Sequence, residues 1–519
     1  MNSFYDFIVV GAGVAGLRGA IELSRFGTVL CLAKRELTES NTQYAQGGIA
    51  VALGPDDSPV IHLRDTLAAG AGLVNETAAR ILVCEGPVRV LELLDWGVRF
   101  DRDELGQLAF TREGAHSRNR VLHADGDSTG REIGRALYAH AQEISNIHFC
   151  EFGFCRDLLV QDGRVIGVEL MLDDASHSEQ VAARAVLLAT GGAGMVFANT
   201  TNPDVATADG AAMAWRAGAE LSDMEFLQFH PTALYVKGAP RFLMSEALRG
   251  EGAYLRNDRR ERFMPACHEL AELAPRDVVA RAIYRELEQS DADDPVVYLD
   301  VTHLDPAKLQ ARFPRIHKTC KQYGLDITRD LIPIRPAAHY AMGGVRTDRD
   351  GRTSLPGLYA AGEAACTGVH GGNRLASNSL LEGLVFGSRA ALAMAAEGAP
   401  VNVAGARACA DSGFGKGDAE SLVQESRELV ESNVGIVRNA EGLQQAVKRL
   451  QEILTELPAA DTCQRAEARN IAECGLAIAR SALARTESRG GHYRSDFPVS
   501  DDANFRKHSI LKGELVHFE

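Results

Sequence analysis

The first thirty residues alternate between apolar runs and regularly spaced small residues. Residues 7–10 form a β-branched and aromatic run, which is typical of a parallel strand buried on both faces. Residues 17–24 carry apolar side chains at helical spacing, and residues 29–32 are a second short apolar run. We therefore expect a strand, a helix and a second strand, as at the start of an α/β domain.

The middle of the chain continues this mixture of periodicities. Apolar spacing predicts a helix at residues 77–94 and a turn with a helix at residues 202–221. Residues 154–190 predict short strands, with a hairpin at Asp162 and Gly163 and an apolar strand at the end of the segment. These patterns are typical of one large α/β unit.

The pattern changes twice more towards the C-terminus. Between residues 225 and 334, strand-like pieces alternate with charged helices such as residues 277–288. Residues 422–457 and 465–483 place apolar side chains at three- and four-residue steps, which predicts a helical bundle.

Composition narrows the class of protein. The 519 residues suffice for about three domains. The net charge of -15 argues against a surface for nucleic acid or anionic membrane, so an anionic substrate requires a local cluster of cations. The ten cysteines form no C-x-x-C pair, and no apolar run reaches the roughly 18 residues of a membrane span. We expect a cytoplasmic protein without a metal site.

The turn after the first apolar run carries the glycines Gly11, Gly13 and Gly16. In the G-x-G-x-x-G fingerprint they allow a tight turn, the approach of a pyrophosphate and close packing of the next helix. The strand, helix and second strand supply the βαβ context that this motif requires, which predicts dinucleotide binding. The acidic residue that usually ends the second strand and binds a ribose is missing, because Ala33 and Lys34 stand there.

Residues 39–50 are polar and end in glycines, and they are too irregular for a helix. The N-terminal fifty residues resemble the succinate dehydrogenase and fumarate reductase flavoprotein family. In the respiratory members a histidine of this segment carries the flavin covalently, whereas Asn41 stands at the matching place here. The resemblance therefore implies FAD that is bound without a covalent tether.

Residues 111–120 are dense in polar groups and predict a mobile surface loop. By itself Glu113 is best interpreted as a solvated carboxylate of that loop. The sequence R-E-G-x-H-S, however, resembles the amino-acid-oxidising members of the family, in which this glutamate faces the substrate ammonium. Glu113 is thus the residue that discriminates between an amino acid and a plain dicarboxylate.

Several polar residues between residue 228 and residue 374 each have a structural explanation when taken singly. Their joint occurrence in order resembles the dicarboxylate site of the family, with serine at a position that is usually threonine. The implied substrate-binding residues are His230, Ser245, Glu246, Arg276, His339 and Arg374, and Arg276 is the implied proton donor when fumarate is reduced.

The resemblance also implies the residues that contact FAD. Asp209 belongs to the second flavin motif, although it could also cap a helix. A glycine-rich loop after residue 370 is expected to enter a helix whose N-terminus faces the flavin. The implied residues are Gly11, Ala12, Gly13, Val14, Ala15, Gly16, Lys34, Asn41, Thr42, Ala45, Gln46, Gly47, Gly48, Asp209, Glu363, Ser379 and Leu380.

The expected fold is an α/β FAD-binding Rossmann-like domain with an inserted α+β capping domain and a C-terminal helical bundle. We place the FAD-binding domain at residues 1–224 and 339–407, the cap at residues 225–338 and the helical domain at residues 408–519. Closure of the cap is expected because hydride transfer requires close contact and exclusion of water.

The implied activity is oxidation of L-aspartate to iminoaspartate. Hydride passes from Cα to flavin N5, and the electrons pass to O2, giving H2O2, or to fumarate. In the family this is the first step of de novo NAD synthesis and feeds quinolinate synthase. Two alternatives remain: a soluble fumarate reductase or succinate dehydrogenase flavoprotein subunit, and a flavin-binding component without catalysis.

Overall fold

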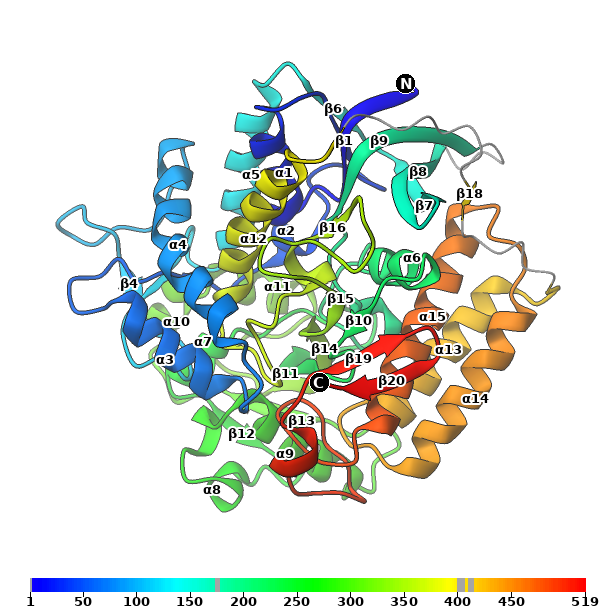
Figure 1. Ribbon diagram of the computed structural model, residues 1–519. Coiled ribbons are helices and arrows are strands. Elements are labelled where there is room, and N and C mark those ends of the chain that lie inside the picture. Colours follow the sequence, from blue (N-terminus) through cyan, green and yellow to red (C-terminus); the bar gives the residue numbers. More distant parts are fainter. Residues whose placement is uncertain (1, 173–177, 399–406, 409–414) are drawn as a thin grey trace.

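A mixed β-sheet with a parallel core lies in the upper part of the view in Figure 1. The computed structural model describes residues 2–172, 178–398, 407–408 and 415–519. Five strands run parallel in the order β6 (Ile147–Cys150), β2 (Val29–Leu32), β1 (Phe4–Val10), β9 (Ser178–Leu188) and β16 (Leu358–Ala360). The expected strands at residues 7–10 and 29–32 are thus confirmed as β1 and β2.

A hairpin extends this sheet on one side. Strands β7 (Gly153–Gln161) and β8 (Arg164–Leu172) are antiparallel, and β8 pairs with the first half of β9. Asp162 and Gly163 join them with φ angles of 50° and 74°. Positive φ at both residues is the geometry of a tight hairpin turn, so the predicted hairpin is confirmed.

Helices cover both faces of the sheet. One face shares a hydrophobic core with α1 (Val14–Leu23), α4 (Glu76–Asp95), α5 (Thr129–Gln142) and α12 (Asn378–Met394). The other face shares a core with α6 (Asp209–Arg216) and with the C-terminal helices α13 (Ala419–Val434), α14 (Ala440–Glu456) and α15 (Cys463–Ala484). The predicted bundle is confirmed, although residues 422–457 form two helices that are separated after Gly435.

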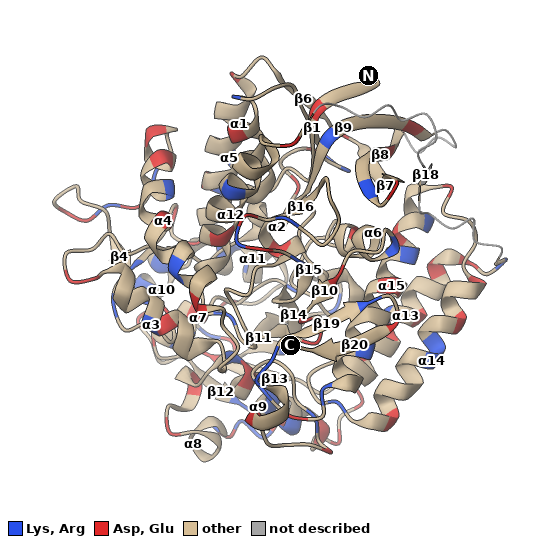
Figure 2. Ribbon diagram, in the orientation of Figure 1, with Lys and Arg blue, Asp and Glu red and all other residues tan. Residues whose placement is uncertain are grey.

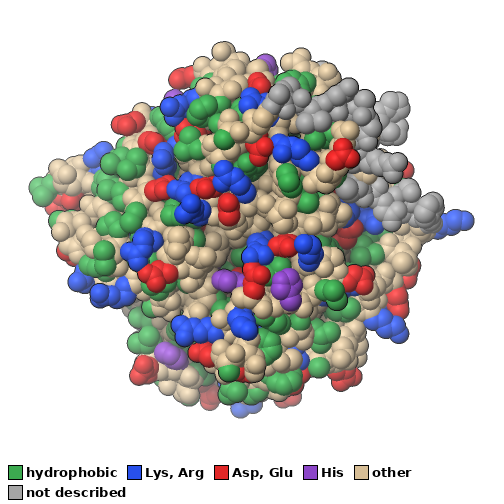
Figure 3. Space-filling model, viewed as in Figure 1, with side chains coloured by type: hydrophobic (Ala, Val, Ile, Leu, Met, Phe, Trp, Pro, Cys, Tyr) green, Lys and Arg blue, Asp and Glu red, His purple; other side chains and the backbone are tan. Residues whose placement is uncertain are grey.

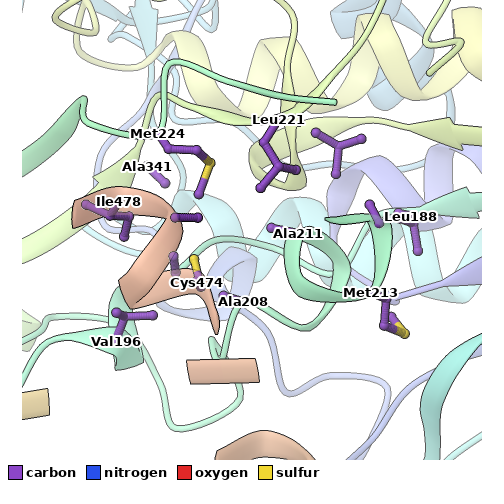
Figure 4. Close-up of a cluster of buried hydrophobic side chains, with 14 of the residues drawn as sticks. Leu188, Val196, Ala208, Ala211, Met213, Leu221, Met224, Ala341, Cys474 and Ile478 are labelled. Carbon is purple, nitrogen blue, oxygen red and sulfur yellow. The ribbon is translucent and has the colours of Figure 1, made fainter. Parts of the chain in front are cut away.

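The C-terminal helices pack directly on the sheet domain. Figure 4 shows Cys474 and Ile478 of α15 in one buried cluster with Ala211 of α6 and Leu188 of β9, with Cys474 next to Ala208. These side chains are all buried. The bundle and the sheet therefore share one continuous core.

A second sheet forms the inserted part of the chain. Its order is β11 (Leu227–Leu234), β14 (Ile332–Ala341), β13 (Val297–Asp300) and β12 (Tyr254–Arg256), and neighbouring strands are antiparallel. Its helices are α7 (Glu246–Gly250), α8 (Met264–Cys267), α9 (Arg276–Glu288), α10 (Pro306–Arg312) and α11 (Pro314–Gln322). Because the chain enters through β11 and leaves through the adjacent β14, this unit closes on itself around its own core.

Smaller elements complete the fold. A sheet of β17 (Ala365–Cys366), β15 (Gly344–Arg346), β10 (Leu221–Ser222), β19 (Ser509–Lys512) and β20 (Leu515–Phe518) ties the C-terminal hairpin to the middle of the chain. The C-terminal region is therefore helical with a β-hairpin at its end. The other elements are α2 (Asn41–Tyr44), β3 (Ile49–Ala50), α3 (Pro59–Ala69), β4 (Phe110–Thr111), β5 (Val121–Leu122), η1 (Gly194–Val196), η2 (Ala271–Leu273), η3 (Gly362–Ala364), β18 (Arg407–Ala408) and α16 (Asp502–Phe505).

The α/β fold with an α+β insertion and a helical C-terminal region is the expected fold class. The domain boundaries themselves stay predictions. The boundary placed between residues 407 and 408 is flanked by residues 399–406 and 409–414, which lie outside the described residues.

Charged side chains of both signs are spread over the outer faces of the helices (Figure 2). On the face shown in Figure 3, basic side chains lie among acidic ones. Within the described residues, no helix is both long and apolar enough to cross a membrane.

Candidate functional site

One continuous cavity runs from the carboxyl ends of β1, β2 and β9 to the inserted sheet. Every residue proposed above as a site residue lines this cavity except Gly16. The carboxyl ends of parallel strands are where open α/β sheets bind their ligands. The sequence-distant segments of the proposed site are thus brought together in one place.

Gly16 acts through packing. A Cβ atom at Gly16 would lie 1.8 Å from the carbonyl oxygen of Gly11, and Gly11 itself has a φ of +111°. Only glycine fits both positions, because the first turn of α1 lies against the turn that follows β1. This contact sets the N-terminus of α1 at the cavity wall.

Lys34 and Asp209 meet at the far end of the cavity, where β2 ends. The Lys34 Nζ atom donates hydrogen bonds to Asp209 Oδ2 (2.8 Å) and to Glu467 Oε1 on α15 (2.6 Å). Burial opposes the ammonium, but Asp209 and Glu467 outweigh it and raise the pKa of Lys34. Helix α6 begins at Asp209 with Ala208 as its N-cap, so the alternative of Asp209 as a helix cap is wrong.

The segment at residues 39–50 contains a short helix, contrary to the sequence-based expectation. Asn41 opens α2, and its Nδ2 atom donates to Glu363 Oε2 at 3.0 Å. The buried Asn41 Oδ1 and Gln46 Oε1 atoms have no hydrogen-bond partner among the described residues. Such atoms on a cavity wall fit a ligand with its own polar groups, as FAD has.

Two helix N-termini point at the same cavity. Val14 and Ala15 lie in the first turn of α1, and Ser379 and Leu380 lie in the first turn of α12. A helix N-terminus carries a partial positive charge and unpaired N–H groups. The two ends are therefore suited to the pyrophosphate and to an electron-rich ring edge.

Two arginines converge where the cavity meets the inserted sheet. Both Arg276 Nη1 and Arg374 Nη2 donate to Gln228 Oε1, at 3.0 and 2.8 Å. Burial and the neighbouring Arg276 lower the pKa of Arg374 to about 10, which leaves it charged at neutral pH. The positive charge of this corner fits an anionic substrate.

Glu246 stands beside Arg276, whose Nε atom donates to Glu246 Oε2 at 2.6 Å. Burial alone would raise the pKa of Glu246, but Arg276 and Arg249 reverse the effect and lower it to about 2. Glu246 is therefore ionised, and it holds Arg276 at the start of α9.

His230 and His339 lie on the adjacent strands β11 and β14 of the inserted sheet, with ring centroids 5.3 Å apart. Burial, together with nearby positive charge, lowers the pKa of each histidine well below its usual value. The buried Nε2 atom of His230 has no partner among the described residues. Both histidines are neutral, and His230 keeps one hydrogen-bonding atom for a ligand.

Glu113 lies on the cavity wall. Its Oε2 atom accepts a hydrogen bond from Ser377 Oγ at 2.7 Å. The surrounding segment is exposed at Arg112, Ala115 and residues 117–119, whereas His116 and Arg120 are buried within it. Arg120 pairs with Asp57 and Asp65, two acids from a distant part of the sequence. The predicted surface loop is therefore confirmed, with two buried anchor residues, and its mobility stays a prediction.

Comparisons with known proteins agree with this site. A family model described as an FAD binding domain matches residues 6–380, and one described as the fumarate reductase flavoprotein C-terminal region matches residues 424–518. L-aspartate oxidase of Streptomyces coelicolor is 44% identical, covering 98% of this chain and 91% of its own. L-aspartate oxidase of Synechocystis is 42% identical, covering 99% and 98%. The chain belongs to the L-aspartate oxidase family.

Solved structures place this family within a wider fold. A quinol-fumarate reductase with menaquinol has a TM-score of 0.93 at 32% identity, covering 100% of this chain and 98% of that chain. Mycobacterium smegmatis Sdh1 has a TM-score of 0.85 at 34% identity, covering 98% and 91%. Family membership establishes FAD as the cofactor, held without a covalent bond.

Sequence reasoning missed three residues of this corner. Gln228 bridges the two arginines, Tyr340 lies under the Arg374 guanidinium at 4.4 Å, and Ser377 contacts Glu113. Gln228 precedes His230 by two residues on one strand, a spacing that normally brings two side chains to the same face. That spacing was the only sequence signal for Gln228.

Proposed function

We propose that this protein oxidises L-aspartate to iminoaspartate, with basic side chains holding the two carboxylates and Glu113 holding the ammonium group. The single observation that carries the assignment of roles is that Glu113 and the pair Arg276 and Arg374 line one cavity. An amino dicarboxylate has the matching charges, two negative and one positive.

Contacts to the two substrate carboxylates contribute most of the binding free energy. Arg276 and Arg374 offer charge-assisted hydrogen bonds, each worth about 1.5 to 3 kcal/mol. His230, His339 and Ser245 add neutral donors on the same wall. Together these contacts offset the desolvation of a dianion inside the protein.

Glu113 sets the preference for an amino acid. Succinate or fumarate would leave its carboxylate in the closed site without a cationic partner. An uncompensated charge of this kind costs a few kcal/mol, which corresponds to roughly tenfold to a thousandfold in affinity. This argument favours an oxidase of L-aspartate over a fumarate reductase or a succinate dehydrogenase subunit.

The residues also prepare the substrate for reaction. FAD, when bound, accepts the hydride from the substrate Cα. The substrate amine must first lose a proton so that its lone pair can assist, and Glu113 is placed to accept that proton. The cap elements carrying His230, Ser245 and Arg276 close over the substrate and exclude water. When fumarate is reduced instead, Arg276 is placed to donate a proton to it.

The partners follow from this chemistry. We propose O2, giving H2O2, or fumarate as the electron acceptor, and quinolinate synthase as the enzyme that consumes iminoaspartate at the start of NAD synthesis. The scattered cysteines favour a cytoplasmic location.

The substitution Glu113→Gln tests the central role, because it keeps the shape and removes the charge. We expect kcat/KM for L-aspartate to fall roughly tenfold to a thousandfold. Fumarate reduction with a reduced dye as electron donor should not fall and should rise, since the variant removes the carboxylate that fumarate leaves without a cationic partner. Equal losses in both reactions would remove Glu113 from its role.

A further inference from the structure

Two contacts join the segment carrying Glu113 to the start of α12. The first segment, residues 112–120, connects β4 to β5 and is called here the Glu113 loop. Ser377 Oγ donates to Glu113 Oε2 at 2.7 Å, and His116 Nε2 lies 2.9 Å from the carbonyl oxygen of Ala376. Two adjacent residues before α12 thus hold two residues of one loop.

The tautomer of His116 follows from its neighbours. A carbonyl oxygen only accepts hydrogen bonds, so the hydrogen sits on Nε2. The Nδ1 atom is then free to accept, and Arg120 Nη1 lies 3.1 Å from it. Burial is the main cause that lowers the pKa of His116 and keeps the ring neutral. The His116 imidazole therefore links Arg120 to Ala376 through one hydrogen bond at each ring nitrogen.

Arg120 anchors this connector. Its Nε and Nη2 atoms donate to the two carboxylate oxygens of Asp57 at 2.8 and 2.9 Å, and its side chain is fully buried. Asp65 contacts Arg120 and also accepts from the N–H and Oγ of Ser117 at 2.8 Å. Ser117 and Arg120 are therefore held by Asp57 and Asp65, while Glu113 and His116 are held by the residues before α12.

Ser377 is held by its backbone. It is the N-cap of α12 with a φ of +63°, and its carbonyl oxygen accepts from Ala50 N at 2.9 Å. The backbone of Ser377 is therefore held in place, and its hydroxyl donates to Glu113 from this position. Glu113 is aligned by a donor that belongs to the same loop as Arg374.

The loop also touches the inserted unit. A Cβ atom at Gly114 would lie 2.1 Å from Glu246 Oε1, the carboxylate that holds Arg276. Glu113 is therefore placed relative to both substrate arginines: Arg374 through Ser377 and Ala376, and Arg276 through Glu246.

We propose that His116 and Ser377 are positioning residues that fix Glu113 relative to the two arginines, and that this alignment determines the preference for amino dicarboxylates. The inference rests on the proposed function of Glu113. The preference increases because the Glu113 carboxylate is already in position when the substrate ammonium group binds.

The test uses the FAD-loaded enzyme and two reactions, L-aspartate oxidation and fumarate reduction. Ser377→Gly removes the hydroxyl, and glycine adopts the positive φ without cost. His116→Ala removes the connector, and His116→Gln restores a donor. We expect Ser377→Gly and His116→Ala to lower kcat/KM for L-aspartate roughly tenfold to a hundredfold, with partial recovery in His116→Gln. Fumarate reduction should stay within about twofold.

A matched control and a double variant separate alignment from general damage. Ser421→Ala removes a hydroxyl that donates to Asp418 Oδ2 at 2.7 Å on α13, outside the cavity, and should leave both reactions unchanged. In a Glu113→Gln background, Ser377→Gly should have less than about a twofold further effect on L-aspartate, because the group that it aligns is already altered. Full additivity, or parallel losses in both reactions, would overturn the inference.

The outcome of Glu113→Gln alone distinguishes this inference from the proposed function. If that variant lowers L-aspartate oxidation and fumarate reduction equally, the proposed role of Glu113 itself is wrong. If it separates them while Ser377→Gly and His116→Ala behave like the parent enzyme, only the positioning role falls.

Discussion

Glu363 occupies an unusual position for a carboxyl group, at the inner wall of the FAD cavity. It accepts hydrogen bonds from the backbone N–H of Ala341 and from Asn41 Nδ2, both at 3.0 Å. Burial outweighs these bonds and raises the pKa of Glu363 from 4.5 to about 7. The folded protein therefore retains a proton here at pH values at which the unfolded chain has lost it.

This shift predicts a pH dependence of stability. Between pH 4.5 and about 7 the unfolded chain binds fewer protons at this site, so the stability contributed by Glu363 declines as the pH rises through that window. Glu363→Gln mimics the protonated form and should remove this part of the decline. Denaturant unfolding of the flavin-free protein at about pH 5 and about pH 7.5 measures it. An identical pH dependence in both proteins would contradict the raised pKa.

Single residues could be read from the sequence where a motif fixes their place. The glycines of the first turn, Asn41 and Glu113 were accessible in this way. Their partners were not, because Ser377 meets Glu113 across 264 residues of sequence. Likewise, the burial of Arg120 depends on Asp57 and Asp65, which the fold brings to it from more than 50 residues away in the sequence.

At the scale of elements, the turn between β1 and α1 leaves no room for a side chain at Gly16. Gly16→Ala would place a methyl group 1.8 Å from the Gly11 carbonyl oxygen, and α1 must shift to relieve it. We expect a loss of about 1 to 3 kcal/mol of stability and a protein that purifies with less FAD. Flavin absorbance relative to protein absorbance measures the second effect.

Gly134→Ala is the matched control. Gly134 lies within α5, and a Cβ there would be 3.7 Å from Thr42 Cγ2, an ordinary contact. Alanine favours a helix over glycine by about 1 kcal/mol, so this variant should keep its FAD and gain slight stability. Equal flavin content in the two variants would show that the tight turn is dispensable.

Elements with a clear period were predictable, and those without one were not. The apolar spacing of α4 and α15 matches their observed positions closely. The four residues of α2 are too few to show any period, so tertiary contacts of Asn41 and Thr42 decide that turn. The C-terminal hairpin β19 and β20 escaped detection because its pairing with β10 spans almost 300 residues of sequence.

The whole molecule places an anionic substrate inside a protein whose net charge is -15. Its attraction must therefore be local, and we propose that Arg276 and Arg374 supply it beneath the surface. The sheet domain contributes Glu113 and Arg374, whereas the inserted unit contributes His230, Ser245 and Arg276. A complete site exists only when these two parts of the chain lie against each other.

The central claim is that this divided site accepts an amino dicarboxylate because Glu113 holds its nitrogen. Anaerobic mixing of the FAD-loaded protein with L-aspartate or with succinate, followed by flavin absorbance, tests it without reference to the electron acceptor. We predict bleaching by L-aspartate that is at least roughly tenfold faster than bleaching by succinate at equal concentration. Bleaching by succinate at an equal or higher rate would contradict the account.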